Sequence, residues 1–244
     1  MRIIQEAFTK SREKGGIITL DLILRMKGII MNHKKIARIK REYGLVTKIR
    51  RRNPYKGICA NAKVHKNIPN LLSRNFIQPE INRAYSTDMT YLFYGKCQKA
   101  YLSATKDLAT NEIISYKLMR SPTITKFVEE FRALLKTLPE EVRKQLIIHS
   151  DQGYQYTHPS FVNLLSEFKV RQSMSRKGNC LDNAPIETFF GHFKDLIDVR
   201  TCRSFEEVQN EVDRTMKYYN YDRPQKGLNK KPPVFYRGLL SSFF

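Results

Sequence analysis

The sequence predicts an α/β fold: a mixed five-stranded sheet flanked by helices, preceded by a small all-α helix-turn-helix unit. Short helical segments separated by glycines occupy the first 56 residues, and strand-like runs followed by alternating helical and strand patterns begin near residue 84. At 244 residues and 41% hydrophobic content, the chain can bury a core. We expect a small helical unit at 1–56, a linker at 57–80 and an α/β core with a C-terminal helical extension at 81–240.

The first helix is expected over residues 3–14, because IIQEAFTKSREK runs up to the Gly15-Gly16 pair. A glycine pair is a strong stop signal for a helix. A second short helix is expected over residues 20–27, with Thr19 as its N-cap and Gly28 after its end. These signals predict two short helices before the most basic segment.

A third helix is expected over residues 33–43, capped by Asn32 and closed by Gly44. Ile36 and Ile39 give it an apolar face, and its other positions are mostly basic: His33, Lys34, Lys35, Arg38, Lys40 and Arg41. This pattern is typical of a helix that lies against DNA, although an ordinary solvated face would look alike. A second basic cluster, KIRRRNPYK, follows and favours DNA. The predicted contacts are Lys34, Lys35, Arg38, Arg41, Arg50, Arg51 and Arg52.

Three runs rich in apolar, β-branched and aromatic residues predict an antiparallel meander over 86–94, 99–109 and 112–119. Gly95 and Asn111 mark its turns. Between the basic unit and this meander, from about residue 53 to 80, prolines and polar residues without periodicity indicate a linker or arm that is ordered only on DNA.

Helical and strand patterns alternate after the meander. We expect helices at 123–138, 158–168, from about Asn183, and at 204–220, and strands at 145–151 and 170–175. Ser204 with Glu207 three residues later is a capping box.

The charge balance points to a polyanionic partner, because Lys+Arg 44 against Asp+Glu 23 gives a net charge of +21. Nucleic acid is the commonest such partner. A membrane surface would also attract this charge, but no apolar run of about 18 residues and no signal sequence is present. Four scattered cysteines without zinc-ligand spacing are interpreted as reduced thiols. We expect a cytoplasmic, nucleoid-associated protein with no membrane partner.

Three carboxylates stand out in so basic a chain. Asp88 lies inside the first strand-like run, Asp151 ends the run LIIHSD, and Glu187 lies one turn into the helix marked by Asn183 and Pro185. A carboxylate at the end of an apolar strand costs several kcal/mol unless it is paired or binds a metal. Three oxygen donors suit Mg2+ or Mn2+, and two such ions can hold both oxygens of a phosphoryl displacement.

Single aspartates at strand ends are more often turn formers than ligands. Asp107 and Asp182 are the chief rivals: Asp107 as a turn or a support for the site, and Asp182 as a helix-start residue that complements the dipole. His149 is interpreted as a hydrogen-bonded structural histidine. Most tyrosines near these segments, and the phenylalanines beside Glu187, are interpreted as packing residues.

Several segments together resemble the second-frame (OrfB-type) transposases of the insertion-sequence-three family, whose catalytic core is shared with retroviral integrases. Thirty-five residues separate Asp151 from Glu187, the spacing by which this Asp, Asp, Glu (DDE) group is recognised. The other matching segments are STDMTYL, HSDQGYQYT, SMSRKGNCLDNAPIETFFGHFK and YNYDRPQKGLNKKPP. They cover most of residues 84 to 236, and the basic unit resembles the family's helix-turn-helix.

The resemblance implies an RNase H-like core with Asp88 on the first strand, Asp151 just after the fourth and Glu187 on the following helix, as catalytic and metal-binding residues. It places Lys194 near DNA, and Gly178 and Asn179 in a mobile turn. Two departures from the family pattern are Ser86, where an aromatic residue is usual, and Asp195, where Glu is common.

The function implied is Mg2+-dependent DNA cleavage and strand transfer at element ends by direct transesterification. Its partners would be double-stranded DNA at the terminal repeats and target, further copies of the chain in a multimer, and an upstream-frame transposase protein. A non-catalytic DNA-binding regulator and a hydrolytic nuclease of the same fold are the alternatives.

Overall fold

The computed structural model of the chain describes residues 2–48, 68–176 and 179–242. By contacts, the chain divides into two compact units. The first is Met1–Lys56 with His192–Asp198 and Asp213–Phe244, and the second is Gly57–Gly191 with Val199–Val212. These units group residues by contact and not by independent folding, so the domain boundaries at residues 56 and 80 stay predictions.

Three helices form the amino-terminal part: α1 (Arg2–Lys10), α2 (Ile17–Met26) and α3 (His33–Glu42). They pack around one small core of Ile4, Ala7, Phe8, Leu20, Ile23, Leu24, Ile36 and Ile39. The Asn32 side chain accepts a hydrogen bond from the Lys34 backbone N–H at 2.8 Å, which caps α3 as predicted. Gly44 has φ of +59° after the end of α3, a conformation that favours glycine.

The predicted N-cap of the second helix was wrong. Helix α2 begins at Ile17, with Gly16 as an N-cap that has no side-chain hydrogen bond, so Thr19 lies inside the first turn. The preceding connection is instead held by Ser11, whose hydroxyl donates to Phe8 O at 2.6 Å and accepts from the Gly15 N–H at 3.0 Å. This contact fixes the end of α1 and leaves Gly16 free to start α2.

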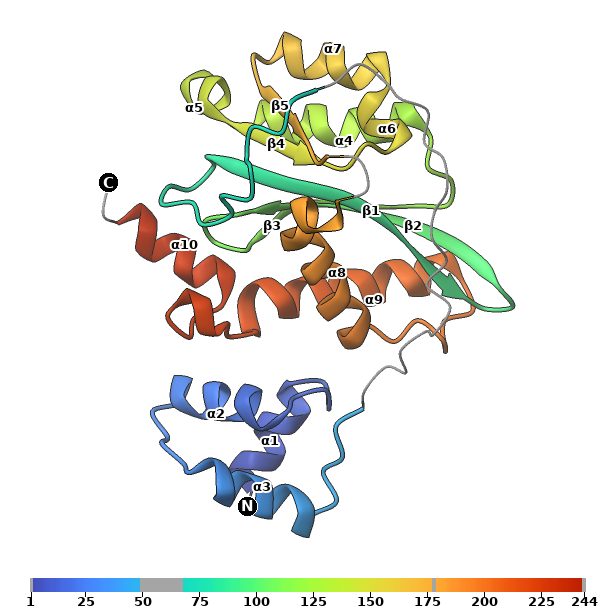
Figure 1. Cartoon of the computed structure of the whole chain (residues 1–244). Coiled ribbons are helices and arrows are strands. Elements are labelled where there is room, and N and C mark those ends of the chain that lie inside the picture. The colour runs from blue at the N-terminus through green and yellow to red at the C-terminus, as the bar shows by residue number, and fades with distance from the viewer. Residues whose placement is uncertain (1, 49–67, 177–178, 243–244) are drawn as a thin grey trace. The chain divides into compact units, whose positions relative to one another are not determined.

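The second unit contains the mixed five-stranded sheet that the sequence predicts (Figure 1). Its strands are β1 (Ala84–Tyr94), β2 (Gln98–Asp107), β3 (Ile113–Met119), β4 (Ile147–Ser150) and β5 (Arg171–Met174). The order is β3-β2-β1-β4-β5, with β1, β2 and β3 antiparallel and β4 and β5 parallel to β1. Gly95 and Asn111, the predicted turn residues, have positive φ between the first three strands.

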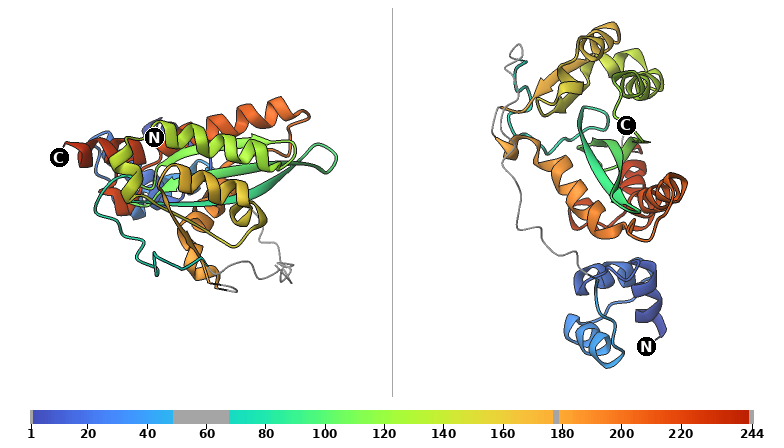
Figure 2. Two further views of the ribbon diagram at one scale, coloured as in Figure 1. Left: turned by 90° about the horizontal axis from the view of Figure 1, so that it is seen from above. Right: turned by 90° about the vertical axis from the view of Figure 1, so that its right-hand side faces the viewer.

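Helices cover both faces of this sheet (Figures 1 and 2). On one face lie α4 (Ile124–Lys136), α5 (Glu140–Gln145), α6 (Tyr154–Thr157) and α7 (Pro159–Glu167). Between them and the sheet, Phe127, Phe131, Phe161 and Tyr156 form an aromatic core with Tyr85 and Ile148. On the other face, a 3-10 turn at Cys180–Asn183 leads into α8 (Ala184–Leu196).

The C-terminal part continues with α9 (Phe205–Lys217), a π-helical turn at Tyr218–Asp222, a 3-10 turn at Lys226–Leu228 and α10 (Pro233–Ser241). Ser204 caps α9, because its hydroxyl accepts the Glu207 N–H at 3.1 Å. The Glu207 carboxylate returns to the Arg203 N–H at 2.7 Å, one residue before the cap. The predicted capping box is therefore present in a shifted form.

Residues 68–80 contain no helix or strand, yet they pack against the core. The Leu71 N–H donates to Ser173 Oγ at 2.9 Å, Met174 N–H donates to Pro69 O at 3.2 Å, and Leu72 is buried. The expectation of an arm ordered only on DNA is thus wrong for this half of the linker. Residues 49–67 lie outside the described residues.

Among the described residues, none of the helices is both long enough and apolar enough to cross a membrane.

Candidate active site

The parallel pairing of β1 with β4 brings two of the predicted acids onto neighbouring strands of the sheet. Ser86 lies opposite His149 in this pairing. Asp88 and Asp151 each follow two residues later, and residues two apart on a strand share a face. Asp88, inside β1, and Asp151, directly after the end of β4, therefore lie on neighbouring strands on the side where Ser86 and His149 lie.

The start of α8 is fixed to that same side of the sheet by three hydrogen bonds. Ser86 Oγ donates to Asn183 Oδ1 at 2.9 Å, and His149 Nε2 donates to Asp182 O at 2.9 Å. The buried Lys106 on β2, which pairs with Ser86, donates through Nζ to Pro185 O at 3.2 Å. These contacts hold the turn before α8 against β1 and β4.

Glu187 lies in the first turn of α8, four residues after Asn183. Residues four apart on a helix share a face, so Glu187 is on the side of α8 from which Asn183 contacts Ser86. The three acids thus occupy the elements that the resemblance implied: β1, the residue after β4, and the helix that follows β5.

The surroundings of the three carboxylates differ. Asp151 is half-buried and accepts the Gly153 N–H through Oδ1 at 2.9 Å. Burial raises the pKa of its carboxyl, and the Gly153 hydrogen bond offsets part of that rise. Asp88 is half-buried and accepts its neighbouring Met89 N–H at 2.7 Å, whereas Glu187 is exposed. A divalent cation would reverse the cost of burying Asp151.

The donor set fits a hard divalent cation, because it consists of carboxylate oxygens. Within residues 2–48, 68–176 and 179–242, however, no three His, Cys, Asp or Glu side chains are placed to hold a metal ion together. The register therefore positions Asp88 and Asp151, and the α8 anchor orients Glu187, but a closed site with these three ligands stays a prediction.

The rival Asp107 is a turn residue. It is fully buried at the end of β2, and its carboxylate accepts the Ala109 N–H at 2.8 Å and the Asn82 N–H at 3.0 Å. This arrangement closes the β2–β3 turn and ties it to Asn82, two residues before β1.

Asp182 does more than mark a helix start. Its buried carboxylate pairs with Arg176 at 2.9 Å and with Arg74 at 2.7 Å, and it accepts the Asn70 side-chain amide at 3.1 Å. These bonds, chiefly the one from Arg176, hold the pKa of the Asp182 carboxyl far below its usual range. Asp182 thus joins residues 70–74 to the turn before α8.

His149 is the structural histidine that the sequence indicated. It is buried, and its Nδ1 lies 2.8 Å from Ser173 Oγ while Nε2 donates to Asp182 O. Burial lowers the pKa of its imidazole, which keeps it neutral. A chain of hydrogen bonds therefore runs from the Leu71 N–H through Ser173 and His149 to the α8 turn.

Three supporting residues were missed by the sequence: Arg74, Arg176 and Lys106. Arg176 stands in the RKGN motif and had a signal there, but Arg74 lies in the linker and Lys106 in a strand, where a basic residue predicts an exposed position. Ser86, noted as a departure from the family pattern, forms the hydrogen bond to Asn183 that an aromatic side chain at this position would lack.

The packing predictions near the site are confirmed. Phe189, Phe190 and Phe193 on α8 are buried, as are Tyr156, Tyr218 and Tyr219, whereas Tyr154 and Tyr221 are exposed. Lys194 is half-buried on α8, seven residues after Glu187. Its contact with DNA stays a prediction. Asn179 is described, and Gly178 lies outside the described residues.

The predicted basic face of α3 is present with one exception. Lys34, Lys35, Arg38 and Arg41 are exposed, while Ile36 and Ile39 are buried beneath them. Lys40 instead turns inward, where Nζ donates to Thr47 Oγ1 at 2.7 Å and Gly15 O at 3.1 Å and lies 4.8 Å from the Phe8 ring centroid. The predicted contacts Arg50, Arg51 and Arg52 lie outside the described residues.

Comparison with known families agrees with both parts of the chain. The Integrase core domain family matches residues 78–180, a second family of that name matches 168–233, and the HTH-like domain family matches 1–53. These ranges include the two strands and the helix that carry the acids, and the three helices that carry the basic face.

The catalytic core domain of HTLV-2 integrase, solved in complex with magnesium in a trimeric form, superposes with a TM-score of 0.51 at 16% identity. The match covers 64% of this chain and 96% of that one, and it shows that the two share a fold.

Among curated proteins, an uncharacterized transposase-like protein of Haemophilus influenzae is 38% identical over 86% of this chain and 94% of its own length. The putative transposase InsK for insertion sequence element IS150 of Escherichia coli is 35% identical over 96% of this chain and 81% of its own. With its integrase core and HTH-like domains, the chain belongs to the insertion-sequence transposases, as a second-frame (OrfB-type) member of the insertion-sequence-three family.

Proposed function

We propose that the protein cleaves DNA at the ends of an insertion element and joins the freed 3′-hydroxyl to target DNA, as a DDE-type polynucleotidyl transferase. The observation that carries this proposal is the parallel pairing of β1 with β4, in which Ser86 lies opposite His149, two residues before Asp88 and Asp151, while Glu187 lies in the first turn of α8. Family membership supports the reaction class, and the residue roles rest on this geometry.

In this proposal Asp88, Asp151 and Glu187 hold two Mg2+ or Mn2+ ions. The ions supply activation of the attacking oxygen and stabilisation of the leaving oxygen in an in-line displacement. The hydrogen bonds from Ser86, His149 and Lys106 hold the start of α8, which carries Glu187, against β1, β2 and β4, and the Asp182 ion pairs keep the preceding turn in place. Rigid support of this kind preserves ligand geometry.

DNA binding is assigned to the exposed basic side chains of α3, Lys34, Lys35, Arg38 and Arg41, with Arg50, Arg51 and Arg52 in the segment that follows, and to Lys194 on α8, seven residues after Glu187. The net charge of +21 supports a polyanionic substrate. Integration joins two element ends to one target, so we propose that the protein acts as a homomultimer on DNA. An upstream-frame transposase protein is a further proposed partner.

The test compares wild-type protein with Asp151→Asn and Glu187→Gln on labelled element-end DNA in Mg2+. We expect each change to slow cleavage and joining by about a thousandfold, because it removes a metal ligand. Glu141→Gln is a matched control, since Glu141 is an exposed carboxylate on α5 whose side chain is 79% accessible. Equal cleavage by all four proteins would refute the assignment.

Measuring DNA binding in the absence of metal distinguishes a catalytic role of Asp151 and Glu187 from a role in binding DNA. We expect all four proteins to bind with equal affinity, and the affinity to fall steeply with salt as counterions are released. A pre-cut end with a free 3′-hydroxyl then distinguishes a transposase from a hydrolytic nuclease. Joined product is expected, and hydrolysis alone would favour the nuclease.

A further inference from the structure

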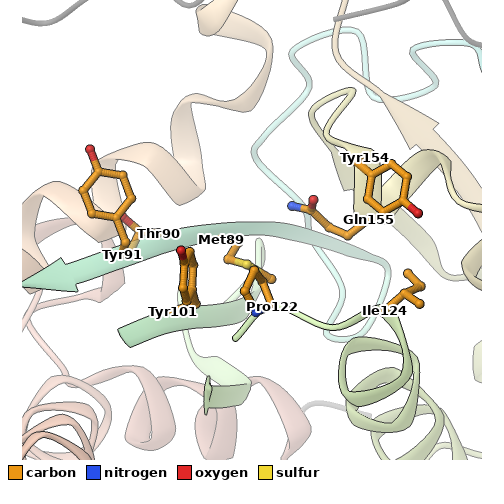
Figure 3. Close-up of a pocket in the computed structure, with 8 residues that line it drawn as sticks. All are labelled: Met89, Thr90, Tyr91, Tyr101, Pro122, Ile124, Tyr154 and Gln155. Atoms are coloured by element: carbon orange, nitrogen blue, oxygen red, sulfur yellow. The ribbon is translucent and has the colours of Figure 1, made fainter. Parts of the chain in front are cut away.

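A half-open cavity of about 310 Å3 is lined in part by residues that follow Asp88 and Asp151 closely in the chain (Figure 3). Its wall comes from β1, β2, the segment leading into α4, and α6. The lining residues are Met89, Thr90, Tyr91, Tyr101, Pro122, Ile124, Tyr154 and Gln155. All eight belong to the second unit, and none of them carries a charge.

Four of the lining residues lie close to Asp88 or Asp151 in the sequence. Met89 is the next residue after Asp88, and Thr90 shares the strand face of Asp88. Tyr154 and Gln155 are three and four residues after Asp151, at the start of α6. A DNA strand whose phosphate lies at the two carboxylates therefore has the bases next to that phosphate within reach of the cavity.

The lining has the chemistry of a nucleobase site and not of a phosphate site. Tyr91 and Tyr101 lie opposite each other on β1 and β2, and Figure 3 shows Tyr154 across the cavity from them. Aromatic faces stack on bases of any sequence, and an amide such as Gln155 both donates to and accepts from a base edge. The apolar remainder, Met89, Pro122 and Ile124, suits a flat ring removed from water.

The outer rim adds positive charge. Tyr91 packs edge-to-face on Phe93 with ring centroids 5.1 Å apart, and Lys99 Nζ lies 5.9 and 5.6 Å from the two centroids. Tyr91 and Phe93 are each half exposed. A cation beside exposed aromatic rings is the combination that binds unpaired nucleic acid, where rings take the bases and the cation takes the backbone.

We infer that this cavity takes up a nucleobase that has flipped out of the duplex next to the phosphodiester at Asp88 and Asp151. The inference rests on the proposed function, because that function places a DNA phosphate at Asp88 and Asp151. Flipping the base frees the phosphate from the stacked duplex, and the tyrosine contacts offset the cost of unpairing. The cavity is then a second DNA-binding site, distinct from the basic face of α3.

The test measures binding without divalent metal, so that it does not depend on catalysis. A fluorescent element-end duplex receives a single mismatch at each position around the reacting phosphate in turn, and the dissociation constant is measured by anisotropy. A mismatch lowers the cost of flipping only at the flipped position. We expect wild-type protein to bind about tenfold more tightly to duplexes mismatched at one or two adjacent positions.

Tyr154→Ala is expected to abolish that gain, so that paired and mismatched duplexes bind within about twofold of each other. Because Tyr154 is 69% exposed, the midpoint of thermal unfolding should not change. Tyr221→Ala is the matched control, an exposed tyrosine outside the cavity that should keep the position-specific gain.

A mismatch effect spread evenly over all positions, or one that survives in Tyr154→Ala, would overturn the inference. Cleavage in Mg2+ is measured separately on the same duplexes. If the mismatch profile is found but Asp151→Asn still cleaves, the proposed function fails and the base site stands. If Asp151→Asn is inactive and the profile is flat, the reverse holds.

Discussion

The helical part at residues 2–48 and the sheet of the second unit differ in whether their charged side chains are exposed or buried. On α3, Lys34, Lys35, Arg38 and Arg41 stay in water, above a small apolar core. In the second unit, the side chains of Asp182, Asp107 and Lys106 are buried, and each is held by hydrogen bonds or ion pairs. Exposed charge is available for a partner, whereas buried charge fixes the backbone that carries the active-site residues.

The strongest test of this difference is Asp182→Asn. Removing one partner of a buried charge network is costly, but Arg74 and Arg176 are partly exposed, which weakens their pairing. We expect the free energy of unfolding at pH 7 to fall by about 2 to 3 kcal/mol. Urea unfolding measures this change.

The pH dependence gives the prediction its sign. The pKa of Asp182 is lowered in the folded protein, so its contribution is present above the unfolded value near 3.8 and is lost as the pH falls below it. The difference between wild type and Asp182→Asn should therefore narrow in acid. Glu167→Gln, which breaks an exposed pair with Arg132, should leave the free energy of unfolding almost unchanged. Equal losses in the two variants would contradict the distinction.

The same difference explains what the sequence predicted and what it did not. Strand and helix periodicity, with glycine and asparagine turns, predicted all five strands and the helices α1 to α4 and α7 to α9, because those signals are local, whereas no helix was predicted over α10. The short helices α5 and α6 carry too few residues for such a pattern. Asp88, Asp151 and Glu187 were found because acids are scarce in this chain, and because the 35-residue interval between Asp151 and Glu187 and the flanking motifs resemble those of a known family.

The residues that support the site gave no comparable signal. Arg74 reaches Asp182 across 108 positions in the chain, and Lys106 contacts a backbone carbonyl 79 positions away. Lys40 has the same local sequence context as the exposed basic residues around it, yet its side chain turns inward toward Gly15 and Thr47. Burial of a long basic side chain is decided by tertiary packing, which no local pattern encodes.

Glu130 on α4 is a buried acid without a close ion pair among the described residues, and the pH dependence of stability tests how its burial affects the fold. Ser115 Oγ donates to Glu130 Oε1 at 3.1 Å, and Lys117 lends weaker electrostatic support. Burial raises the pKa of the Glu130 carboxyl to about 7. The folded state therefore binds a proton that the unfolded state, with a pKa near 4.5, has already released at neutral pH.

For a raised carboxyl pKa, stability is highest below the unfolded value and falls as the pH rises toward the folded one. We expect wild type to lose about 2 kcal/mol between pH 5 and pH 8 relative to Glu130→Gln, which cannot ionise. Chemical denaturation of both proteins across this range measures the difference. Parallel pH profiles would show that Glu130 ionises at no cost and that the core tolerates an unpaired acid.

Within the helical part, Lys40 and Lys35 form a matched pair on one helix. Lys40→Ala removes the hydrogen bonds to Thr47 and Gly15 and should lower stability by about 1 kcal/mol. Lys35→Ala leaves stability unchanged, because its side chain is exposed, and should weaken binding of element-end DNA about threefold to tenfold. The slope of log affinity against log salt should fall by about one for Lys35→Ala alone.

The two lysines separate the assignment of the basic face from the effect of net charge. Both changes remove one positive charge, so a substrate attracted only by the field of the whole protein would lose equal affinity in both variants. A loss confined to Lys35→Ala places DNA on the exposed face of α3. Equal losses would mean that α3 contributes only charge, because the Lys40 ammonium is held by Thr47 and Gly15, and the DNA contacts would then have to be sought on other basic residues.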